Sequence, residues 1–264
     1  MLAVLLEKFD EKLVASLSFQ RNKEFKVYIP QGAEWLSEYE AQLQVVYGGL
    51  NEVQEPLVCF LEPGAVPDKH FVGRVLRAAR WHKNYDVFHV NLSAGKAFPC
   101  RMKAARFFKW ALVEARPVPL SSFVFRTEKL RERAVFRPDG SLNPIPTILA
   151  SAQEKPIHNV WLEKLEWIAP PVSQDPVSVE KRLLDRLEVL RWTEYYYGED
   201  NYPIGVGDRL DLFAREIAKL YPLYTPDQMK EQMNLFRASE GTIRKVRAAS
   251  ALKNAVRKRQ VELQ

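Results

Sequence analysis

The chain has 264 residues, of which 47% are hydrophobic and 27% are charged, and its formal net charge is +6. This composition is that of an ordinary folded protein and excludes wholesale disorder, and the length suffices for one large core or for a domain with an appendage. The two cysteines, Cys59 and Cys100, are too few for a disulfide framework or a cysteine-based metal site, so a reducing, cytoplasmic location is expected.

The first third of the chain alternates between strand and helix patterns. The run Met1–Leu6 is apolar but reaches Glu7 and Lys8 without a preceding basic stretch, which indicates a first strand and neither a signal peptide nor a spanning helix. Further strands are predicted over 25–29, 57–61 and 85–90, with helices between them over 10–19, 34–47 and 67–79. This alternation predicts an α/β fold with a mostly parallel sheet and right-handed crossovers.

Helical and extended segments continue as far as a proline-rich boundary at Pro170–Pro176. Before it, extended segments are predicted over 121–125 and 157–168, and helices over 102–114, 126–130 (capped by Thr127) and 145–152. Beyond it, helices are predicted over 179–197, 208–221, 226–235 and 243–261, with Asp208 and Thr225 as N-caps. We therefore expect an α/β domain over residues 1–172 and an all-helical extension over residues 173–264.

The apolar strand predicted at Leu57–Leu61 stops abruptly at Glu62, which Pro63 and Gly64 follow. An unbroken apolar run is typical of a central strand that is covered on both faces, and ligands of open α/β sheets bind at the carboxyl ends of such strands. Glu62 is therefore a candidate contact for a diphosphate or a metal ion. The alternative is that its carboxylate stabilises the start of the next helix, an interaction worth roughly 0.3–1 kcal/mol.

The C-terminal segment, residues 241–264, contains seven basic residues and one acidic residue, a surplus equal to the +6 of the whole chain. Apolar residues recur at helical spacing between the basic ones, so this segment predicts a basic amphipathic helix that can lie on an anionic membrane surface or bind an acidic partner. The alternative is a terminal helix that docks through its apolar stripe and leaves a solvated charged face. Nucleic-acid binding is not expected, because no recognition motif accompanies the charge.

Three segments of the first 172 residues resemble the family-2 glycosyltransferases. The helix that ends in Ser16-Leu-Ser-Phe-Gln20 and leads into a strand ending at Ile29 is similar to the family's Ser-Leu-x-x-Gln helix and second strand. Asn51 before the segment Glu55–Leu61 resembles the Asn that precedes the family's third core strand, and Ser121–Leu130 resembles the family's strand leading to Phe-Arg-Arg and a short helix. The resemblance implies the GT-A fold, a Rossmann-like sheet that binds a nucleotide sugar.

The resemblance also implies where the nucleotide sugar, most simply a UDP-sugar, would bind. The family contacts its donor through the loops that follow the first three core strands, which correspond here to Glu7–Phe9, Pro30–Gly32 and Glu62–Gly64. The implied nucleotide-sugar-binding residues are accordingly Glu7, Phe9, Gln31 and Glu62.

The sequence departs from the family at the residues that carry chemistry. The family's Asp-x-Asp motif, which holds a divalent metal on the diphosphate, is replaced by Glu62-Pro63-Gly64, which puts a Mn²⁺ or Mg²⁺ cofactor in doubt. The family's late Glu-Asp pair, which supplies the catalytic base, should fall near residues 142–145, where the nearest carboxylate is Asp139 in a Pro-Asp-Gly turn. Arg126 or a lysine of the C-terminal segment is a candidate for neutralising a diphosphate without metal, and the catalytic residues are unknown.

Two functions are consistent with this pattern. The first is transfer of a sugar from a nucleotide sugar to an acceptor hydroxyl in the synthesis of a glycan or cell-surface polysaccharide, by a protein that is cytoplasmic or bound at the membrane surface. The second is a catalytically inactive GT-A-like binding or scaffold protein, because both carboxylate motifs are absent together. Whether the chain is an enzyme stays open at this point.

Overall fold

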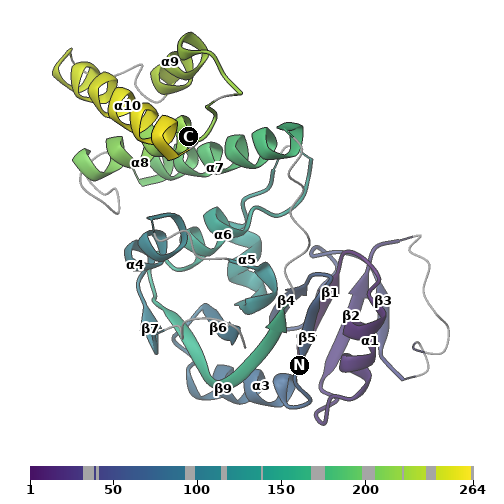
Figure 1. The fold of residues 1–264 in the computed structure, drawn as a ribbon. Coiled ribbons are helices and arrows are strands. Elements are labelled where there is room, and N and C mark those ends of the chain that lie inside the picture. The colour runs from purple at the N-terminus through teal and green to yellow at the C-terminus, as the bar shows by residue number, and fades with distance from the viewer. Residues whose placement is uncertain are drawn as a thin grey trace. The chain divides into compact units, whose positions relative to one another are not determined.

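The computed structural model describes residues 1–31, 39, 42–92, 99–113, 118–137, 139–167, 176–197, 206–221, 223–235 and 242–262 (Figure 1). The chain divides into two compact units, Met1–Pro170 and Pro171–Gln264, and each is described by itself.

Nine strands of the first unit form one sheet. They are β1 (Leu2–Leu6), β2 (Phe25–Ile29), β3 (Val45–Tyr47), β4 (Leu57–Leu61), β5 (Ala65–Pro67), β6 (Val87–Leu92), β7 (Arg101–Met102), β8 (Phe123–Arg126) and β9 (Ile157–Trp167). The order is β3-β2-β1-β4-β8-β6-β9-β5, with β7 beside β9. Six strands run in one direction, and β5, β7 and β8 run against them. The predicted mostly parallel α/β sheet is confirmed.

Helices cover both faces of this sheet. Helices α1 (Glu11–Ser18) and α3 (Phe71–Trp81) pack on one face, and α4 (Ala104–Phe108), α5 (Thr127–Arg133) and α6 (Pro144–Ser151) lie on the side opposite α3 (Figure 1). A single π-helical turn, Lys109–Val113, follows α4. Because alternate strand residues point to opposite faces, a strand covered on both faces must be apolar throughout, as β1 and β4 are.

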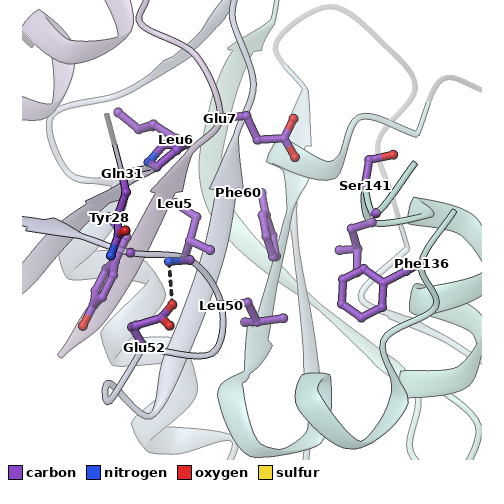
Figure 2. Close-up of a pocket in the computed structure, with 15 residues that line it drawn as sticks. Leu5, Leu6, Glu7, Tyr28, Gln31, Leu50, Glu52, Phe60, Phe136 and Ser141 are labelled. Atoms are coloured by element: carbon purple, nitrogen blue, oxygen red, sulfur yellow. Dashed lines mark hydrogen bonds between the residues drawn. The ribbon is translucent and has the colours of Figure 1, made fainter. Parts of the chain in front are cut away.

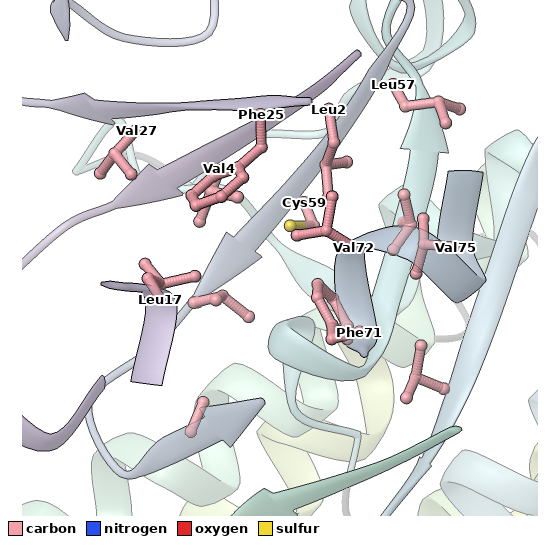
Figure 3. Packing of buried hydrophobic residues seen from close by; sticks show 14 of the residues in the cluster. Leu2, Val4, Leu17, Phe25, Val27, Leu57, Cys59, Phe71, Val72 and Val75 are labelled. Carbon is pink, nitrogen blue, oxygen red and sulfur yellow. The ribbon is translucent and has the colours of Figure 1, made fainter. Parts of the chain in front are cut away.

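The main hydrophobic core lies between the sheet and the helices α1 and α3. Figure 3 shows Phe71, Val72 and Val75 of α3 against Leu57 and Cys59 of β4. Each of these side chains is at most 3% exposed, and full burial of a side chain of this size contributes roughly 1.5–3 kcal/mol. This packed core holds β1, β2 and β4 in place.

Three details of the predicted elements are wrong. Val45–Tyr47, expected as the end of a helix over 34–47, is instead the edge strand β3, paired in parallel with β2. Val-Val-Tyr is a β-favouring run, and sheet pairing outweighs its helical spacing. Residues 34–38, 40 and 41 of the predicted helix lie outside the described residues. Thr127 does not cap α5, because its hydroxyl donates to the carbonyl of Glu55 at 2.6 Å. Asp208 lies inside the first turn of α8, not before it.

The second unit consists of helices in the part that the structure describes, as expected for an all-helical extension. They are α7 (Pro176–Tyr197), α8 (Val206–Ala218), α9 (Pro226–Leu235) and α10 (Thr242–Glu262). Helices α7 and α10 both pack on α8, whose Phe213 and Ile217 are buried. Thr225 caps α9 as predicted: its hydroxyl accepts from the amide of Gln228, whose side chain accepts from the Thr225 amide. Of the described helices, none has the length and apolarity needed to cross a membrane.

Candidate functional site

A cavity of about 460 Å³ lies where β1 and β2 end. Its lining comes from five parts of the first unit: Leu5 and Leu6 of β1 with Glu7 after it; Tyr28 of β2 with Pro30 and Gln31 after it; Gly48, Gly49, Leu50 and Glu52 after β3; Phe60 of β4; and Phe136 and Gly140–Leu142 from the segment between α5 and α6. The parallel register brings these strand ends together, since Leu5 is paired with both Tyr28 and Phe60. The cavity thus occupies the edge at which open α/β sheets bind ligands.

The walls of the cavity are largely apolar and partly aromatic. Phe60 projects into it from β4, and Phe136 lies across the opening on the opposite wall (Figure 2). Phe60 is 7% exposed and belongs to the core, whereas Phe136 is 55% exposed. An exposed phenylalanine facing an apolar wall is suited to hold a flat ring by stacking.

The segment that carries Phe136 is a short hairpin with a defined turn. Phe136 forms a β-bridge with Leu142, and Gly140 has a φ of 82°, a backbone conformation that favours glycine. Asp139 closes the turn, since its Oδ1 accepts from both the amide and the hydroxyl of Ser141, at 2.9 and 2.6 Å. Asp139 therefore serves the turn, as its Pro-Asp-Gly context indicates, and Ser141 beside it lines the cavity.

Three polar side chains surround the apolar walls: Glu7, Gln31 and Glu52. Glu52 is held by the amide of Gly49, which donates to its Oε2 at 2.7 Å (Figure 2). A Cβ at Gly48 would lie 3.0 Å from Glu52 Cβ, so a glycine at this position lets the Glu52 side chain pack closely. Figure 2 shows Glu7 on the opposite side of Phe60 from Glu52, so carboxylates flank the apolar wall.

Tyr28, a lining residue of the cavity, belongs to a buried network with Glu55 and Lys26. The hydroxyl of Tyr28 donates to Oε2 of Glu55 at 2.8 Å, and Oε1 of Glu55 is 2.8 Å from Nζ of Lys26. Burial of Glu55 raises the pKa of its carboxyl, but the hydrogen bonds from Lys26 and Tyr28 outweigh this, so the pKa lies below the usual 4.5. The Tyr28 ring is thereby fixed in the cavity wall.

The structure brings two of the four predicted site residues together. Glu7 and Gln31 both line the cavity. Phe9 is 41% exposed and is not among the lining residues. Glu62, also outside the lining, is half-buried and bound to Ser121: the Glu62 amide donates to Ser121 Oγ at 2.8 Å, and Glu62 Oε2 accepts from the amide and hydroxyl of Ser121 at 3.2 and 3.1 Å.

Arg126 is also engaged elsewhere. It is the last residue of β8 and is paired with Leu57, the first residue of β4. Its guanidinium donates to the carbonyls of Tyr85, Ala79 and Lys83 at 2.8, 3.2 and 3.2 Å, which closes the end of α3. This arrangement contradicts the proposed role in neutralising a diphosphate, because Leu57 begins β4 and the cavity lies where the neighbouring strands end.

The described residues do not gather the ligands of a divalent metal into one cluster. Hard cations such as Mg²⁺ and Mn²⁺ take several oxygen ligands, including carboxylates. Across the parts of the chain that the structure describes, no three His, Cys, Asp or Glu side chains gather into a group that could hold a metal ion. The carboxylate of Glu62 is bound by Ser121, so the residues at the end of β4 do not fit the two-carboxylate clamp of the family.

Sequence reasoning missed several residues of the cavity, among them Glu52, Phe60 and Phe136. The sequence pattern predicts a helix over 34–47 that ends at Gly48-Gly49, so it does not indicate that Glu52 follows a strand. Phe136 lies 76 residues beyond Phe60 in the chain, and no local pattern indicates that the two side chains meet. The only available signal was the Pro-Asp-Gly turn, which predicts a tight loop near Asp139.

Comparison with solved structures decides the fold. The crystal structure of residues 1–349 of S. aureus TarS with UDP superposes with a TM-score of 0.55 at 9% identity, over 99% of this chain and 91% of that one. The complex of the same TarS fragment with UDP-GlcNAc gives 0.56 at 10% identity, over 99% and 92%. A longer TarS structure gives 0.59 at 13% identity, over 97% of this chain and 54% of that one.

The fold is the GT-A fold of glycosyltransferases. No protein-family model and no curated protein matches the chain by sequence. The GT-A fold is therefore established by structure alone, at sequence identities too low to carry over an activity.

Proposed function

We propose that the chain binds a nucleotide sugar, with a UDP-sugar as the first candidate, in the cavity at the ends of β1 and β2. The observation that carries this proposal is the position of the cavity in a GT-A fold: it is apolar, flanked by Glu7, Gln31 and Glu52, and located at the carboxyl ends of parallel strands. TarS, which shares the fold, is crystallised with UDP and with UDP-GlcNAc.

The residues have distinct roles in this proposal. Phe136 and Phe60 hold the base between them, with Leu5 beneath it. Gln31 and Glu52 are placed to hydrogen-bond the polar edge of the base, and Glu7 accepts from a ribose hydroxyl, as carboxylates do in other Rossmann-like sites. Phe9 and Glu62 have no direct contact with the nucleotide part of the donor in this arrangement.

The proposed reaction is transfer of the sugar to an acceptor hydroxyl of a glycan. The residues at the end of β4 do not fit the family's two-carboxylate metal clamp, so the proposal assigns no role to a metal ion. A specific observation favours the second candidate, an inactive binding protein: Asp139 is bound in its turn and Glu62 in its contact with Ser121, so neither is placed as a catalytic base. Nucleotide binding is common to both candidates, and turnover separates them.

A thermal-shift titration tests the proposal. Purified protein is titrated with UDP, GDP, CMP and UDP-sugars, each with and without Mn²⁺; a ligand at 100 times its dissociation constant stabilises the fold by about 2.7 kcal/mol. Stabilisation by one nucleotide class supports donor binding, and no response to any nucleotide would refute it. Release of UDP from a stabilising UDP-sugar, measured with and without candidate acceptors, then distinguishes an enzyme from a scaffold.

The basic helix α10 supports a separate proposal, contact with an anionic surface or acidic partner. Leu252 is 9% exposed and faces the helical unit, while Lys253, Arg257 and Lys258 are exposed. The apolar stripe is thus at least partly used in packing, and the basic face carries the contact. Co-sedimentation with anionic vesicles, compared with neutral vesicles and with a Lys253→Gln/Arg257→Gln/Lys258→Gln variant, tests this; equal binding of both proteins would contradict it.

A further inference from the structure

Helix α3 carries basic residues and a tryptophan along one stripe. Arg74, Arg77 and Trp81 follow one another at spacings of three and four residues, which places them on the same side of the helix. The apolar residues of α3 are buried against the sheet, so this stripe faces outward. Trp81 is 77% exposed, an unusual position for so large an aromatic side chain.

Two adjoining cavities share this stripe. One, of about 410 Å³, is formed with His82, Arg101 and His158. The other, of about 930 Å³, is formed with Arg21, Lys23 and Arg80. Both include Arg74, Arg77 and Trp81 in their linings. We call the combined lining cations the arginine track: Arg21, Lys23, Arg74, Arg77, Arg80 and Arg101.

The arginine track is a local concentration of charge. The chain has 39 basic and 33 acidic residues, and residues 241–264 hold seven and one of these, which leaves 32 of each elsewhere. The rest of the chain is thus neutral, yet the two cavities contain six cations and one carboxylate, Glu24, which is paired with Arg80 at 2.7 Å. Within the described residues, no ion pair is formed by Arg77 or Arg101.

The histidine that lines the smaller cavity is almost fully buried. His158 is 7% exposed, and its Nδ1 has no hydrogen-bond partner within the described structure. Its ring lies 3.9 Å from that of His82 and 4.9 Å from that of Tyr85, between centroids. Burial is the largest cause that lowers the pKa of His158 to about 4, and the neighbouring His82 and Arg101 lower it further. The lining cations of the arginine track favour an anionic occupant of the two cavities.

We propose that the arginine track binds a linear polyanion of closely spaced phosphate groups. Arginine is the side chain best suited to phosphate, since its planar guanidinium donates two parallel hydrogen bonds. Two adjoining cavities with cations along both provide for more than one phosphate. Phosphate oxygens also supply the acceptors and the negative charge that this surface lacks.

This site is separate from the nucleotide-sugar cavity. His158 is paired with Phe88 near the start of β6, so the smaller cavity lies where β6 and β9 begin. The donor cavity lies where β1 and β2 end, and the two have no lining residue in common. The inference therefore goes beyond the proposed function, and loss of one site leaves the other to be measured.

The test measures binding of linear inorganic polyphosphate to the full chain by isothermal titration. Arg77→Gln/Arg101→Gln removes two exposed cations of the track; Arg106→Gln/Lys109→Gln removes the same charge from exposed positions outside both cavities. We expect the first pair to weaken binding by at least about tenfold, since each lost charged hydrogen bond is worth more than 1 kcal/mol. The control pair should change affinity by less than about twofold.

Three results would overturn the proposal. The first is absence of polyphosphate binding to the wild-type chain. The second is a pattern that assigns binding elsewhere. Equal weakening by the two variant pairs would assign the effect to net charge, and loss of binding only in Lys253→Gln/Arg257→Gln/Lys258→Gln would assign it to α10. The third is tight binding of single-stranded DNA without binding of polyphosphate, which would indicate a nucleic-acid surface. Titration of the same variants with UDP reports on the donor cavity independently.

Discussion

Ser121 and Glu62 hold each other through both backbone and side chain. The Glu62 amide donates to the hydroxyl of Ser121, and this hydroxyl and the Ser121 amide both donate to the Glu62 carboxylate. Ser121 is fully buried, and it lies in the 3-10 turn Leu120–Ser122 that leads into β8. The contact therefore fastens the end of β4 to the start of the strand that runs antiparallel to it.

Loss of this contact should cost stability. Ser121→Ala keeps the backbone amide but removes the hydroxyl that donates to the Glu62 carboxylate and accepts from the Glu62 amide, so we expect the free energy of unfolding to fall by about 1–3 kcal/mol. Urea denaturation of Ser121→Ala, Glu62→Gln and the double variant measures the coupling. Ser18→Ala is the control, since the Ser18 hydroxyl donates only to Ala15 within α1. Additive effects of the two substitutions would show that the residues do not act as a pair.

The same contact predicts that Glu62 does not bind the nucleotide. Glu62→Gln keeps the shape of the side chain and can still accept from Ser121, so the dissociation constant for UDP should change by less than about twofold. A loss of affinity of about tenfold or more in a variant with unchanged stability would return Glu62 to the donor site, where the family resemblance places it.

Arg126 should be needed for stability and not for nucleotide binding. Arg126→Ala removes the hydrogen bonds to the carbonyls of Tyr85, Ala79 and Lys83, so we expect destabilisation of about 2 kcal/mol or more. The measurement is thermal unfolding with and without saturating UDP. The UDP-induced increase in Tm should match that of the wild type; disappearance of this increase in a folded variant would assign the guanidinium to the diphosphate.

Glu55 should make stability depend on acid pH. Because its pKa is lower in the folded chain than the usual 4.5, the unfolded chain binds a proton first on acidification. The contribution of Glu55 is present above about pH 4.5 and is lost as pH falls through the lower, folded pKa. The free energy of unfolding, measured by urea denaturation, should fall less between neutral pH and a pH below about 4.5 for Glu55→Gln than for the wild type. An identical pH dependence would contradict the cause assigned to this pKa.

His158 should act in a higher pH range. Its pKa of about 4 in the folded chain lies below the ordinary 6.5, so the unfolded chain takes up a proton that the folded chain does not. Its contribution to stability is complete above pH 6.5 and is lost as pH falls towards 4. His158→Phe keeps the ring and removes the titration, so its stability should fall less between about pH 7 and about pH 5. A steeper fall in stability for His158→Phe than for the wild type would contradict a lowered pKa of His158.

The sequence predicted the parts of the fold that depend on local pattern. The apolar runs of β1 and β4, the alternating pattern of β2 and the Pro30-Gln31-Gly32 break after it are local signals, and they place Glu7 and Gln31 directly after strands, as the structure shows. The role of Glu62 depends on Ser121, 59 residues away, and the wall opposite Phe60 depends on Phe136, 76 residues away. Such contacts arise from tertiary packing and leave no periodic trace in the sequence. Edge strand β3 was missed because three residues are too few to show a period.

The central claim is that the cavity at the ends of β1 and β2 binds a nucleotide, and titration of UDP into Phe136→Ala tests it most directly. Phe136 is exposed and can be truncated without opening the core, and Phe19→Ala, at an exposed phenylalanine after α1, is the matched control. Stacking on a base is worth roughly 1–3 kcal/mol, so Phe136→Ala should weaken UDP binding by about tenfold and Phe19→Ala should leave it unchanged. Absence of UDP binding to the wild type, or equal affinity in wild type and Phe136→Ala, would contradict the account.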